Sequence, residues 1–419
     1  MSQRAVAIFS DDETGPLLAE AARRVGYEPH FFFSFCPTKP WDYPWYKVDP
    51  YLPPEQLANT IKGLLGTPMG IVSCIEQLSV NLAKTAELLQ ISYSPVHAFE
   101  ILRDKSLMKS VWAKAGVRTP VSCLIRQASD LDQVRFEYPL IVKPTHGAAS
   151  AGVRIVDDEE MLKKQMKQIF RFNATTLGAE QIEKPGILIE EYIDGDEYSV
   201  DTLWLEGKPL LNGIMSKGNP QGPTFPDRLY YTDPYLNPQI EEELLRLSHA
   251  AVSSAGIYSG ATHTEIRMRN NQGFVLEAAL RPGAGACFYE IFEKAYGVPY
   301  YEALIILSLG RHSEQDLCRL EEISRTVHKA SSRLYWYNMA YRGHGIISSI
   351  SGADEILSQP FVDKIAIRKK PGDYLSPESE SYAYLGWIIG EMPKAVTIEH
   401  FNDLLEQMEQ SIQICYKTS

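Results

Sequence analysis

Apolar and polar positions along the first hundred residues alternate between short apolar runs and amphipathic stretches. Three runs are almost wholly apolar, which is typical of strands covered on both faces: residues 4–9, 30–33 and 69–74. Three stretches have the pattern of helices, the first of them opening at Pro16 and ending before Gly26: residues 16–25, 54–65 and 76–90. This alternation predicts a parallel sheet with helices on its faces.

The segment between the second strand and the second helix has a different composition. Residues 37–54 are rich in Pro, Trp and Tyr and are expected to form a long loop, which inside a compact domain is a candidate for function. The first strand is followed by Ser10-Asp-Asp-Glu-Thr-Gly15 in place of Gly-x-Gly-x-x-Gly. A dinucleotide site in this lobe therefore has no support.

From Val117 onward the pattern predicts a small α+β unit and then a second set of strands. The small unit is expected to contain three strands and an amphipathic helix: residues 120–125, 139–144 and 186–193, with the helix over 157–170. The later part is expected to contain a hairpin turning at 206–208, a helix over 238–255, and two strands, 261–268 and 274–280. The last hundred residues mix strands and helices without a recognisable chemical signature.

Composition excludes several classes of protein. The chain has 419 residues, enough for two or three domains, with 41 Lys and Arg against 53 Asp and Glu, a formal charge of -12. An acidic total argues against a nonspecific binder of nucleic acid or of anionic membranes, but not against a small anionic ligand. The six cysteines include no Cys-x-x-Cys pair, and neither a signal peptide nor a membrane span is recognisable. We expect a soluble cytoplasmic protein with reduced thiols.

The first candidate for chemistry is Lys143 and the loop that follows it. Lys143 ends an apolar strand, and the residues up to Val153 are dominated by Gly, Ala and Ser. Such a loop lets backbone N–H groups approach a polyphosphate while the lysine supplies a charge. It is not a Walker loop, and taken alone it is equally consistent with an ordinary flexible hairpin.

The second candidate is the acidic stretch from residue 187 to 201. Glu190 and Glu191 end a strand, an Asp-Gly turn follows, and Glu197 opens the next strand. A hinge of this kind can present backbone groups to a purine edge, with Glu197 reaching the ribose hydroxyls. Read in isolation, the stretch is also consistent with a solvated edge.

The third candidate is a pair of glutamates on the two strands joined at residues 270–273. Pairing that is symmetric around Asn271 brings Glu265 and Glu277 opposite each other on one mostly buried face. Two carboxylates there would repel unless they share a cation, and hard oxygen ligands suit Mg²⁺. Arg281 is expected at the rim, to neutralise a phosphoryl group or clamp a carboxylate. Two surface glutamates on a hairpin remain the alternative, and His263 alone fits a hydrogen-bonding residue better than a metal ligand.

The order and spacing of these groups resemble the ATP-grasp superfamily from about Arg103 to Gly285, and the leading lobe fits its N-terminal domain. The resemblance implies an α/β (α+β) chain with the ATP-grasp fold in three domains. These are a Rossmann-like lobe at 1–101, a small lid domain at 102–196 and a larger domain at 197–419, whose residues from about 311 form an appended subdomain.

The resemblance also implies roles for individual residues. Lys105 and Lys143 match the lysines that reach the nucleotide phosphates. The lid over the phosphates corresponds to the loop that contains His146, Ala149, Ser150 and Gly152. The adenine hinge corresponds to Glu190, Glu191, Tyr192 and Ile193, the ribose acid to Glu197, and the Mg²⁺ ligands to Glu265 and Glu277, with Mn²⁺ as the alternative ion.

One departure from the superfamily pattern narrows the resemblance. Many ATP-grasp ligases have Asn two positions after the last metal glutamate, whereas this chain has Ala279. The Glu-x-Ala-x-Arg form and Ala-Thr-His-Thr-Glu-Ile resemble the L-amino-acid ligases, which are dipeptide synthetases of the bacilysin type, as does the end of the chain around Lys370. On this basis His263, Arg281, Gly283 and Gly285 are expected on the amino-acid side, and Lys217 is expected to contact the γ-phosphate.

The implied activity is an ATP-dependent acid–amino-acid ligase that forms an amide through an acyl phosphate. The implied partners are ATP, Mg²⁺ and small-molecule amino acids, with a homodimer as the expected assembly and no nucleic acid or membrane. Three alternatives stay open: a ligase with a carrier-protein or natural-product acceptor, served by the aromatic segment 41–51; a carboxylase or purine-biosynthetic enzyme; and a non-catalytic nucleotide sensor.

Overall fold

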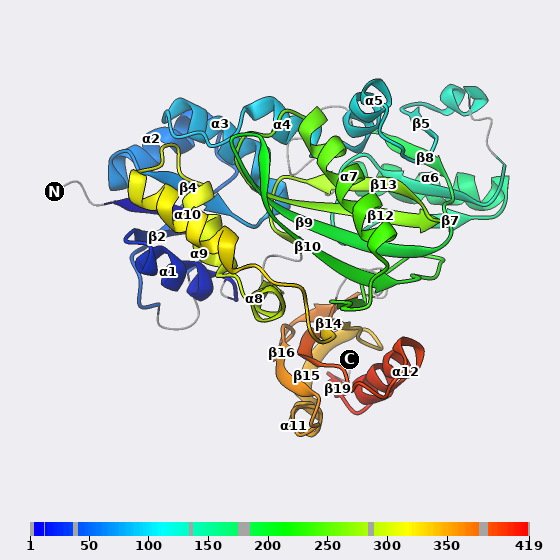
Figure 1. The fold of residues 1–419 in the computed structure, drawn as a ribbon. Helices are drawn as coiled ribbons and strands as arrows, with labels where there is room; N and C mark the ends of the chain where they lie inside the picture. The colour runs from blue at the N-terminus through cyan, green and yellow to red at the C-terminus, as the bar shows by residue number, and fades with distance from the viewer. Residues whose placement is uncertain are drawn as a thin grey trace.

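The structure, a computed structural model, describes residues 4–11, 13–36, 41–133, 137–174, 185–283, 289–376 and 384–417. Four sheets organise these residues (Figure 1). Their strand orders are β3-β2-β1-β4, β5-β8-β6-β7, β13-β12-β9-β10-β11-β14-β18-β16 and β17-β15-β19. The α/β (α+β) class expected from the sequence is confirmed.

The N-terminal lobe is a parallel four-stranded sheet, as the alternation of apolar runs and helices predicts. Its elements are β1 (Ala5–Phe9), α1 (Gly15–Arg24), β2 (Glu28–Phe33), β3 (Trp45–Lys47), α2 (Pro54–Leu65), β4 (Gly70–Ser73), a 3₁₀ turn (Glu76–Leu78) and α3 (Ser79–Leu88). All five side chains of β1 are buried, since helices cover both faces. The expectation of a loop throughout residues 37–54 is wrong at β3, where Trp45 pairs with Phe31. Residues 37–40 lie outside the described part.

The lid is an antiparallel four-stranded sheet with one helix packed on it. It is preceded by two helices, and its elements in order are α4 (Val96–Ile101), α5 (Lys105–Ala115), β5 (Ser122–Ile125), a 3₁₀ turn (Ala128–Gln133), β6 (Leu140–Pro144), β7 (Arg154–Val156), α6 (Glu159–Phe172) and β8 (Ile187–Glu191). Leu162, Met166 and Ile169 of α6 are buried against the sheet, so the predicted apolar stripe is confirmed, with Met161 only partly buried at its edge.

The central sheet is antiparallel throughout its eight strands. Its first elements are β9 (Asp196–Leu205), β10 (Lys208–Gly218), β11 (Leu229–Tyr231), α7 (Pro238–Ser254), β12 (Gly260–Arg269) and β13 (Gln272–Ala279). Glu265 is the direct partner of Glu277, as symmetric pairing predicts, and an irregularity in the ladder follows between Glu265 and Ile266. This register places both carboxylates at one position along the sheet.

The rest of the chain packs back onto the parts before it. Its elements are α8 (Tyr289–Tyr296), α9 (Tyr300–Leu307), α10 (Glu314–Thr326), β14 (Leu334–Met339), β15 (Gly345–Ser351), α11 (Ala353–Leu357), β16 (Val362–Ile367), β17 (Tyr374–Leu375), β18 (Gly386–Glu391), α12 (Ile398–Glu409) and β19 (Gln413–Tyr416). Helices α9 and α10, yellow in Figure 1, lie beside the blue N-terminal lobe, where Tyr27 donates a hydrogen bond to Asp316 (2.8 Å). Strands β14, β18 and β16 extend the central sheet beyond β11.

No helix within the described ranges combines the length and the apolar character that a membrane crossing requires.

Glu293 on α8 generates a prediction about the pH dependence of stability. It is largely buried, and its Oε1 accepts a hydrogen bond from the Tyr301 backbone N–H (3.1 Å). Burial raises the pKa of Glu293 from 4.5 to about 7. Because this folded-state pKa is raised, the stability that protonated Glu293 contributes is complete below pH 4.5 and is lost as the pH rises through 7. We expect Glu293→Gln to unfold with a free energy roughly 1–2 kcal/mol above wild type at pH 8, after allowing for solvent screening.

Urea unfolding at pH 4.5 and pH 8 measures this difference, and Glu242→Gln, exposed on α7, is the control. A wild-type-to-variant difference that is the same at both pH values would contradict the assignment.

Candidate active site

A cavity of about 520 Å³ opens where the N-terminal lobe, the lid and the central sheet face one another. The N-terminal lobe, the lid, the central sheet and the C-terminal part of the chain all contribute residues to its wall. The lobe contributes Ser10 and Glu76, and the lid side contributes Lys105, Lys143 and residues 147–151 and 190–193. The central sheet and its connections contribute Glu197, Asp227, His263, Glu265, Glu277 and Arg281. The C-terminal part contributes Trp336, Asn338, Arg368, Lys369 and Tyr384.

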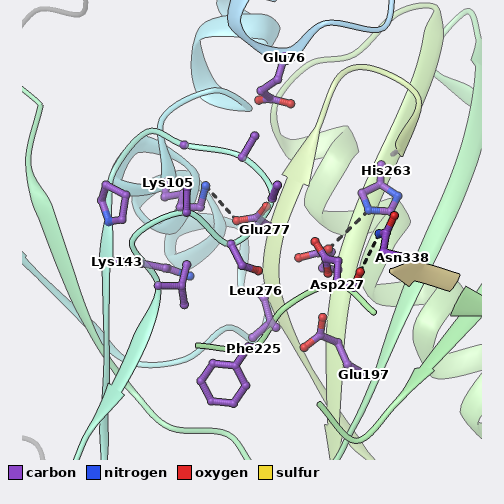
Figure 2. A pocket seen from close by; sticks show the side chains of 18 of the residues that line it. Glu76, Lys105, Lys143, Glu197, Phe225, Asp227, His263, Leu276, Glu277 and Asn338 are labelled. Carbon is purple, nitrogen blue, oxygen red and sulfur yellow. Dashed lines mark hydrogen bonds and ion pairs between the residues drawn. The ribbon is translucent and has the colours of Figure 1, made fainter. Parts of the chain in front are cut away.

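Two lysines enter the cavity from the lid side (Figure 2). Lys105 is the first residue of α5, where the Asp104 side chain caps the helix by accepting from the Ser106 N–H (2.7 Å). Its ammonium group lies 2.9 Å from a Glu277 oxygen. Lys143 lies near the end of β6, so both lysines are held on regular elements and both are buried.

Lys143 shares its carboxylate partner with a third lysine. Glu190 lies 2.7 Å from the Lys143 ammonium group and 2.9 Å from that of Lys109. Burial would raise the pKa of Glu190, but Lys109 and Lys143 outweigh it and hold the pKa below its usual value. Burial lowers the pKa of Lys109 to about 8 against the attraction of Glu190. One carboxylate for two lysines leaves a net positive charge on this wall, which favours an anion.

The small-residue loop that follows Lys143 forms the roof of the cavity. Ala149 and Ser150 both have left-handed backbone conformations, with φ of 52° and 57°. Residues 147–151 line the cavity, whereas Gly152 lies outside it, where an added Cβ would come within 3.2 Å of Pro144. His146 is also outside the cavity wall: its Nδ1 hydrogen-bonds to the Thr145 hydroxyl (3.0 Å), and burial lowers its pKa to about 4. The backbone N–H groups of this loop are therefore the part that can meet a ligand.

Three carboxylates form a cluster on the opposite wall. The carboxylate oxygens of Glu197, Asp227 and Glu265 lie within 4.8 Å of one another. Lys217 lies among them, 2.6 Å from Asp227 and 3.0 Å from Glu265, and it also pairs with Glu197. Burial would lower the pKa of Lys217, but the three acids raise it well above 10.5. The donor set consists of hard oxygens, which fits Mg²⁺.

His263 connects this cluster to a buried hydrogen-bond network. Its Nδ1 lies 2.8 Å from Asp201, and its Nε2 lies 3.6 Å from Glu265. Asp201 also accepts hydrogen bonds from Ser199 (2.9 Å) and from Tyr289. Asp201 and Glu265 outweigh burial and raise the pKa of His263 to about 9. The network fixes the orientation of the ring at the cavity wall.

Arg281 forms an ion pair with an acidic residue of the N-terminal lobe. Its guanidinium group pairs with Glu76, which opens the 3₁₀ turn before α3. Burial would raise the pKa of Glu76, but Arg281, Arg103 and Lys105 together hold it below its usual value. This pair connects β13 and the residues after it to the N-terminal lobe across the cavity.

Comparison with known proteins agrees with this geometry. The family described as the ATP-grasp domain matches residues 136–290, and the family described as L-amino acid ligase C-terminal domain 2 matches residues 339–417. The chain contains an ATP-grasp domain, as its sequence predicts. Its fold is that of the crystal structure of an L-amino acid ligase from Bacillus licheniformis, with a TM-score of 0.82 and 22% identity over 100% of both chains.

Two curated relatives of this ATP-grasp protein are ligases. Alanine–anticapsin ligase of Bacillus subtilis is 25% identical over 66% of this chain and 62% of its own length. D-Alanine–D-alanine ligase of Pediococcus pentosaceus is 23% identical over 52% of this chain and 60% of its own length. The match therefore spans less than two thirds of each of these relatives.

Most of the residues predicted from the sequence of this ATP-grasp protein meet at the cavity. The cavity wall includes thirteen of them: Lys105, Lys143, Ala149, Ser150, Glu190, Glu191, Tyr192, Ile193, Glu197, His263, Glu265, Glu277 and Arg281. The structure does not bring His146, Gly152, Lys217 or Gly283 to the wall, although Lys217 supports three acids there. Gly285 lies outside the described residues.

Several residues of the site have no signal in the sequence. Three of them form ion pairs with predicted residues: Glu76 with Arg281, Lys109 with Glu190, and Asp227 with Lys217. No role was predicted for any of the three from the sequence. The C-terminal wall residues were also missed, since Trp336 and Asn338 lie on a strand with an ordinary apolar pattern and Arg368, Lys369 and Tyr384 lie in connections between strands. The one usable signal was a charged residue inside an apolar pattern, as with Lys109, which follows Met108 and lies three residues before Trp112 on the buried face of α5.

Lys217 generates a prediction about the metal-free protein. Lys217→Met keeps the length of the side chain but removes the cation that the three carboxylates share, so that Glu197 keeps only Arg267 and Glu265 only His263. We expect a loss of roughly 3–5 kcal/mol in the free energy of unfolding in buffer containing EDTA, measured by urea denaturation. Lys208→Met, exposed on the same strand, is the control. Equal midpoints for the two variants would show that the cluster does not depend on Lys217.

Proposed function

We propose that this ATP-grasp protein is an ATP-dependent carboxylate–amine ligase that joins two amino acids in an amide bond and releases ADP and phosphate. The observation that carries the proposal is the convergence of two lysines, a small-residue roof and opposed glutamates on one cavity with room for further substrates. The names of both curated relatives, alanine–anticapsin ligase and D-alanine–D-alanine ligase, support it. A cytoplasmic location and a homodimer stay predictions.

The chemistry explains why such a site needs ATP. A carboxylate is a poor electrophile and hydroxide a poor leaving group. In the proposed first step a carboxylate oxygen attacks the γ-phosphorus of ATP, the bond to ADP breaks, and an acyl phosphate forms. In the second step the amine nitrogen attacks the acyl carbon and phosphate leaves with the amine proton. The protein contributes positioning and charge neutralisation at the moving phosphoryl group.

The lid side of the cavity is assigned to the nucleotide. Lys105 and Lys143 would neutralise its phosphates beneath the roof at residues 147–151, which would also exclude water. The Glu190 carboxylate is occupied by two lysines, so recognition of the purine would use the backbone of the hinge from Glu190 to Ile193. Glu197 would reach the ribose, although Arg267 (2.8 Å) and Lys217 already hold its carboxylate.

The central sheet is assigned to the metal and the acid substrate. Glu265 and Glu277 would hold Mg²⁺, or Mn²⁺, which supplies positive charge to the phosphates when bound. Binding there would require Lys105 to release Glu277 and Lys217 to release Glu265. A contact of Lys217 with the γ-phosphate stays a prediction, which would also require Lys217 to leave Glu197 and Asp227. His263, Arg281 and Gly283, with Gly285, are assigned to the amino acid that is activated.

Glu277→Ala tests the metal assignment. It removes one of the two opposed carboxylates while leaving the β12–β13 ladder, which is held by backbone hydrogen bonds. We expect a loss of ADP release of at least a hundredfold, since the phosphoryl charge is no longer neutralised. The assay measures ADP and phosphate over pairs of the twenty amino acids with ATP and Mg²⁺, with products identified by mass spectrometry.

Glu160→Ala, on the exposed face of α6, is the control, and thermal unfolding of both variants checks the fold. Retained turnover in Glu277→Ala would remove this residue from the metal site. If wild type releases no ADP with any pair, the dipeptide assignment is wrong. ADP release that depends on bicarbonate or formate would favour a carboxylase or purine-biosynthetic activity instead.

A further inference from the structure

Lys109 is buried behind the lid side of the cavity, and no role in the proposed reaction has been assigned to it. It lies on α5 and is only 6% exposed. Its ammonium group pairs with Glu190 and donates to the Thr119 hydroxyl (2.5 Å), which in turn donates to the Val275 carbonyl (2.7 Å). The cavity is lined by Lys143 and Glu190 but not by Lys109. Any effect of Lys109 on a ligand is therefore transmitted by the residues that it contacts.

The Glu190 carboxylate bridges Lys109 and Lys143, with one oxygen for each ammonium group. Its Oε1 lies 2.9 Å from Lys109 Nζ, and its Oε2 lies 2.7 Å from Lys143 Nζ. Glu190 pairs with Ile141 across β8 and β6, and Lys143 follows two residues later, so Glu190 and Lys143 lie on the same face of the lid sheet. In the described part of the chain, Glu190 is the only carboxylate that forms an ion pair with either lysine. The two lysines therefore share one counter-charge.

The charge that Lys143 offers to a phosphate depends on what else neutralises Glu190. All three side chains are buried, so water screens their charges little. Two ammonium groups and one carboxylate leave one net positive charge on the group. Without the charge of Lys109 the group would be neutral, and Glu190 would oppose Lys143 alone.

Glu190 also needs a partner when Lys143 turns to a ligand. A buried carboxylate that loses its only cation is strongly destabilised, whereas a carboxylate that keeps a second cation stays paired. Lys109 is held by Thr119 and lies outside the cavity wall, so we expect it to stay with Glu190 when a nucleotide binds. Lys143 can then exchange Glu190 for a phosphate without leaving an unpaired buried charge.

We propose that Lys109 is a positioning residue for nucleotide binding: by holding Glu190, it leaves Lys143 with the positive charge that a phosphate requires. This role rests on the proposed ligase function, which assigns the lid side to the nucleotide, and adds a residue that touches no substrate. The effect is confined to ligands that carry phosphate, because the hinge backbone assigned to the purine does not depend on this charge.

Binding of ADP with Mg²⁺ to the full chain, measured by isothermal titration calorimetry without amino acids, tests this role. Lys109→Met removes the charge and keeps the length of the side chain. We expect the Kd for ADP to rise roughly 10- to 100-fold, since Glu190 then opposes Lys143 alone. Adenosine has no phosphate, and its Kd, measured by equilibrium dialysis, is expected to change by less than about threefold.

A second substitution separates this role from a purely structural one. Lys109→Met combined with Glu190→Gln removes one positive and one negative charge, so Lys143 again carries the net charge of the group. We expect the double variant to bind ADP within about threefold of wild type, a recovery that lost packing alone would not give. Glu190→Gln by itself is expected to bind ADP at least as tightly as wild type, because no carboxylate then opposes Lys143.

Lys114→Met is the matched control, because Lys114 is exposed on the same helix and does not line the cavity. Thermal unfolding checks that each variant is folded. If Lys109→Met does not fold, ADP binding to Glu190→Gln and to the double variant decides the question, and weaker binding in either of them would overturn the role of Lys109.

The outcomes separate this role from the proposed function. An unchanged Kd for ADP in Lys109→Met, an equal loss with adenosine, or no recovery in the double variant would overturn the role of Lys109 and leave the ligase function intact. A wild-type protein that binds ADP but turns over no ATP with any pair of amino acids would overturn the dipeptide assignment and leave the role of Lys109 intact. A wild-type protein that does not bind ADP would overturn both.

Discussion

Lys217 carries a buried positive charge that balances three carboxylates from different segments, and the wall of the cavity depends on that balance. Glu197 opens β9, Asp227 precedes β11 and Glu265 lies on β12, so their mutual repulsion would separate three strands if the lysine were absent. The same principle operates on the lid, where Lys109 and Lys143 share Glu190. Buried charges are tolerated only when they are paired, so each of these groups determines where its neighbours lie.

This arrangement connects the fold to the proposed chemistry. The pairs Lys105–Glu277 and Lys217–Glu265 join basic residues to the acids assigned to the metal. A bound nucleotide and its cation could replace both kinds of partner: the phosphates would pair with the lysines, and the divalent ion would pair with the glutamates. The internal pairs thus neutralise much of the charge at the cavity wall and can be exchanged for a ligand with little change in net charge. The Glu13–Arg368 ion pair joins the C-terminal part of the chain to the N-terminal lobe.

Local patterns predicted much of the fold. Apolar runs and amphipathic stretches located the parallel lobe, the α6 stripe and the hairpins, because these features depend on residues a few positions apart. The tight turn after β12 was enough to predict that Glu265 and Glu277 are partners. Strand β3 was missed because its three residues lie in a segment rich in Pro and aromatic residues, and pairing with β2 makes it a strand. The sequence also did not predict that the central sheet continues through β14, β18 and β16. An apolar strand pattern predicts a strand but does not indicate which strand it pairs with.

The sequence by itself indicated the candidates for the chemistry. Lys143, Glu265 and Glu277 follow from their places at a strand end and on a hairpin, and Lys105 from the resemblance to the ATP-grasp superfamily. Only the tertiary structure decided their partners. Glu190 is 47 positions from Lys143, and Asp227 and Asn338 meet although 111 positions separate them, because β11 pairs with β14 across the sheet. The C-terminal wall of the cavity exists only after that pairing, since charge and hydrogen-bond complementarity between distant segments is a property of packing and not of local pattern.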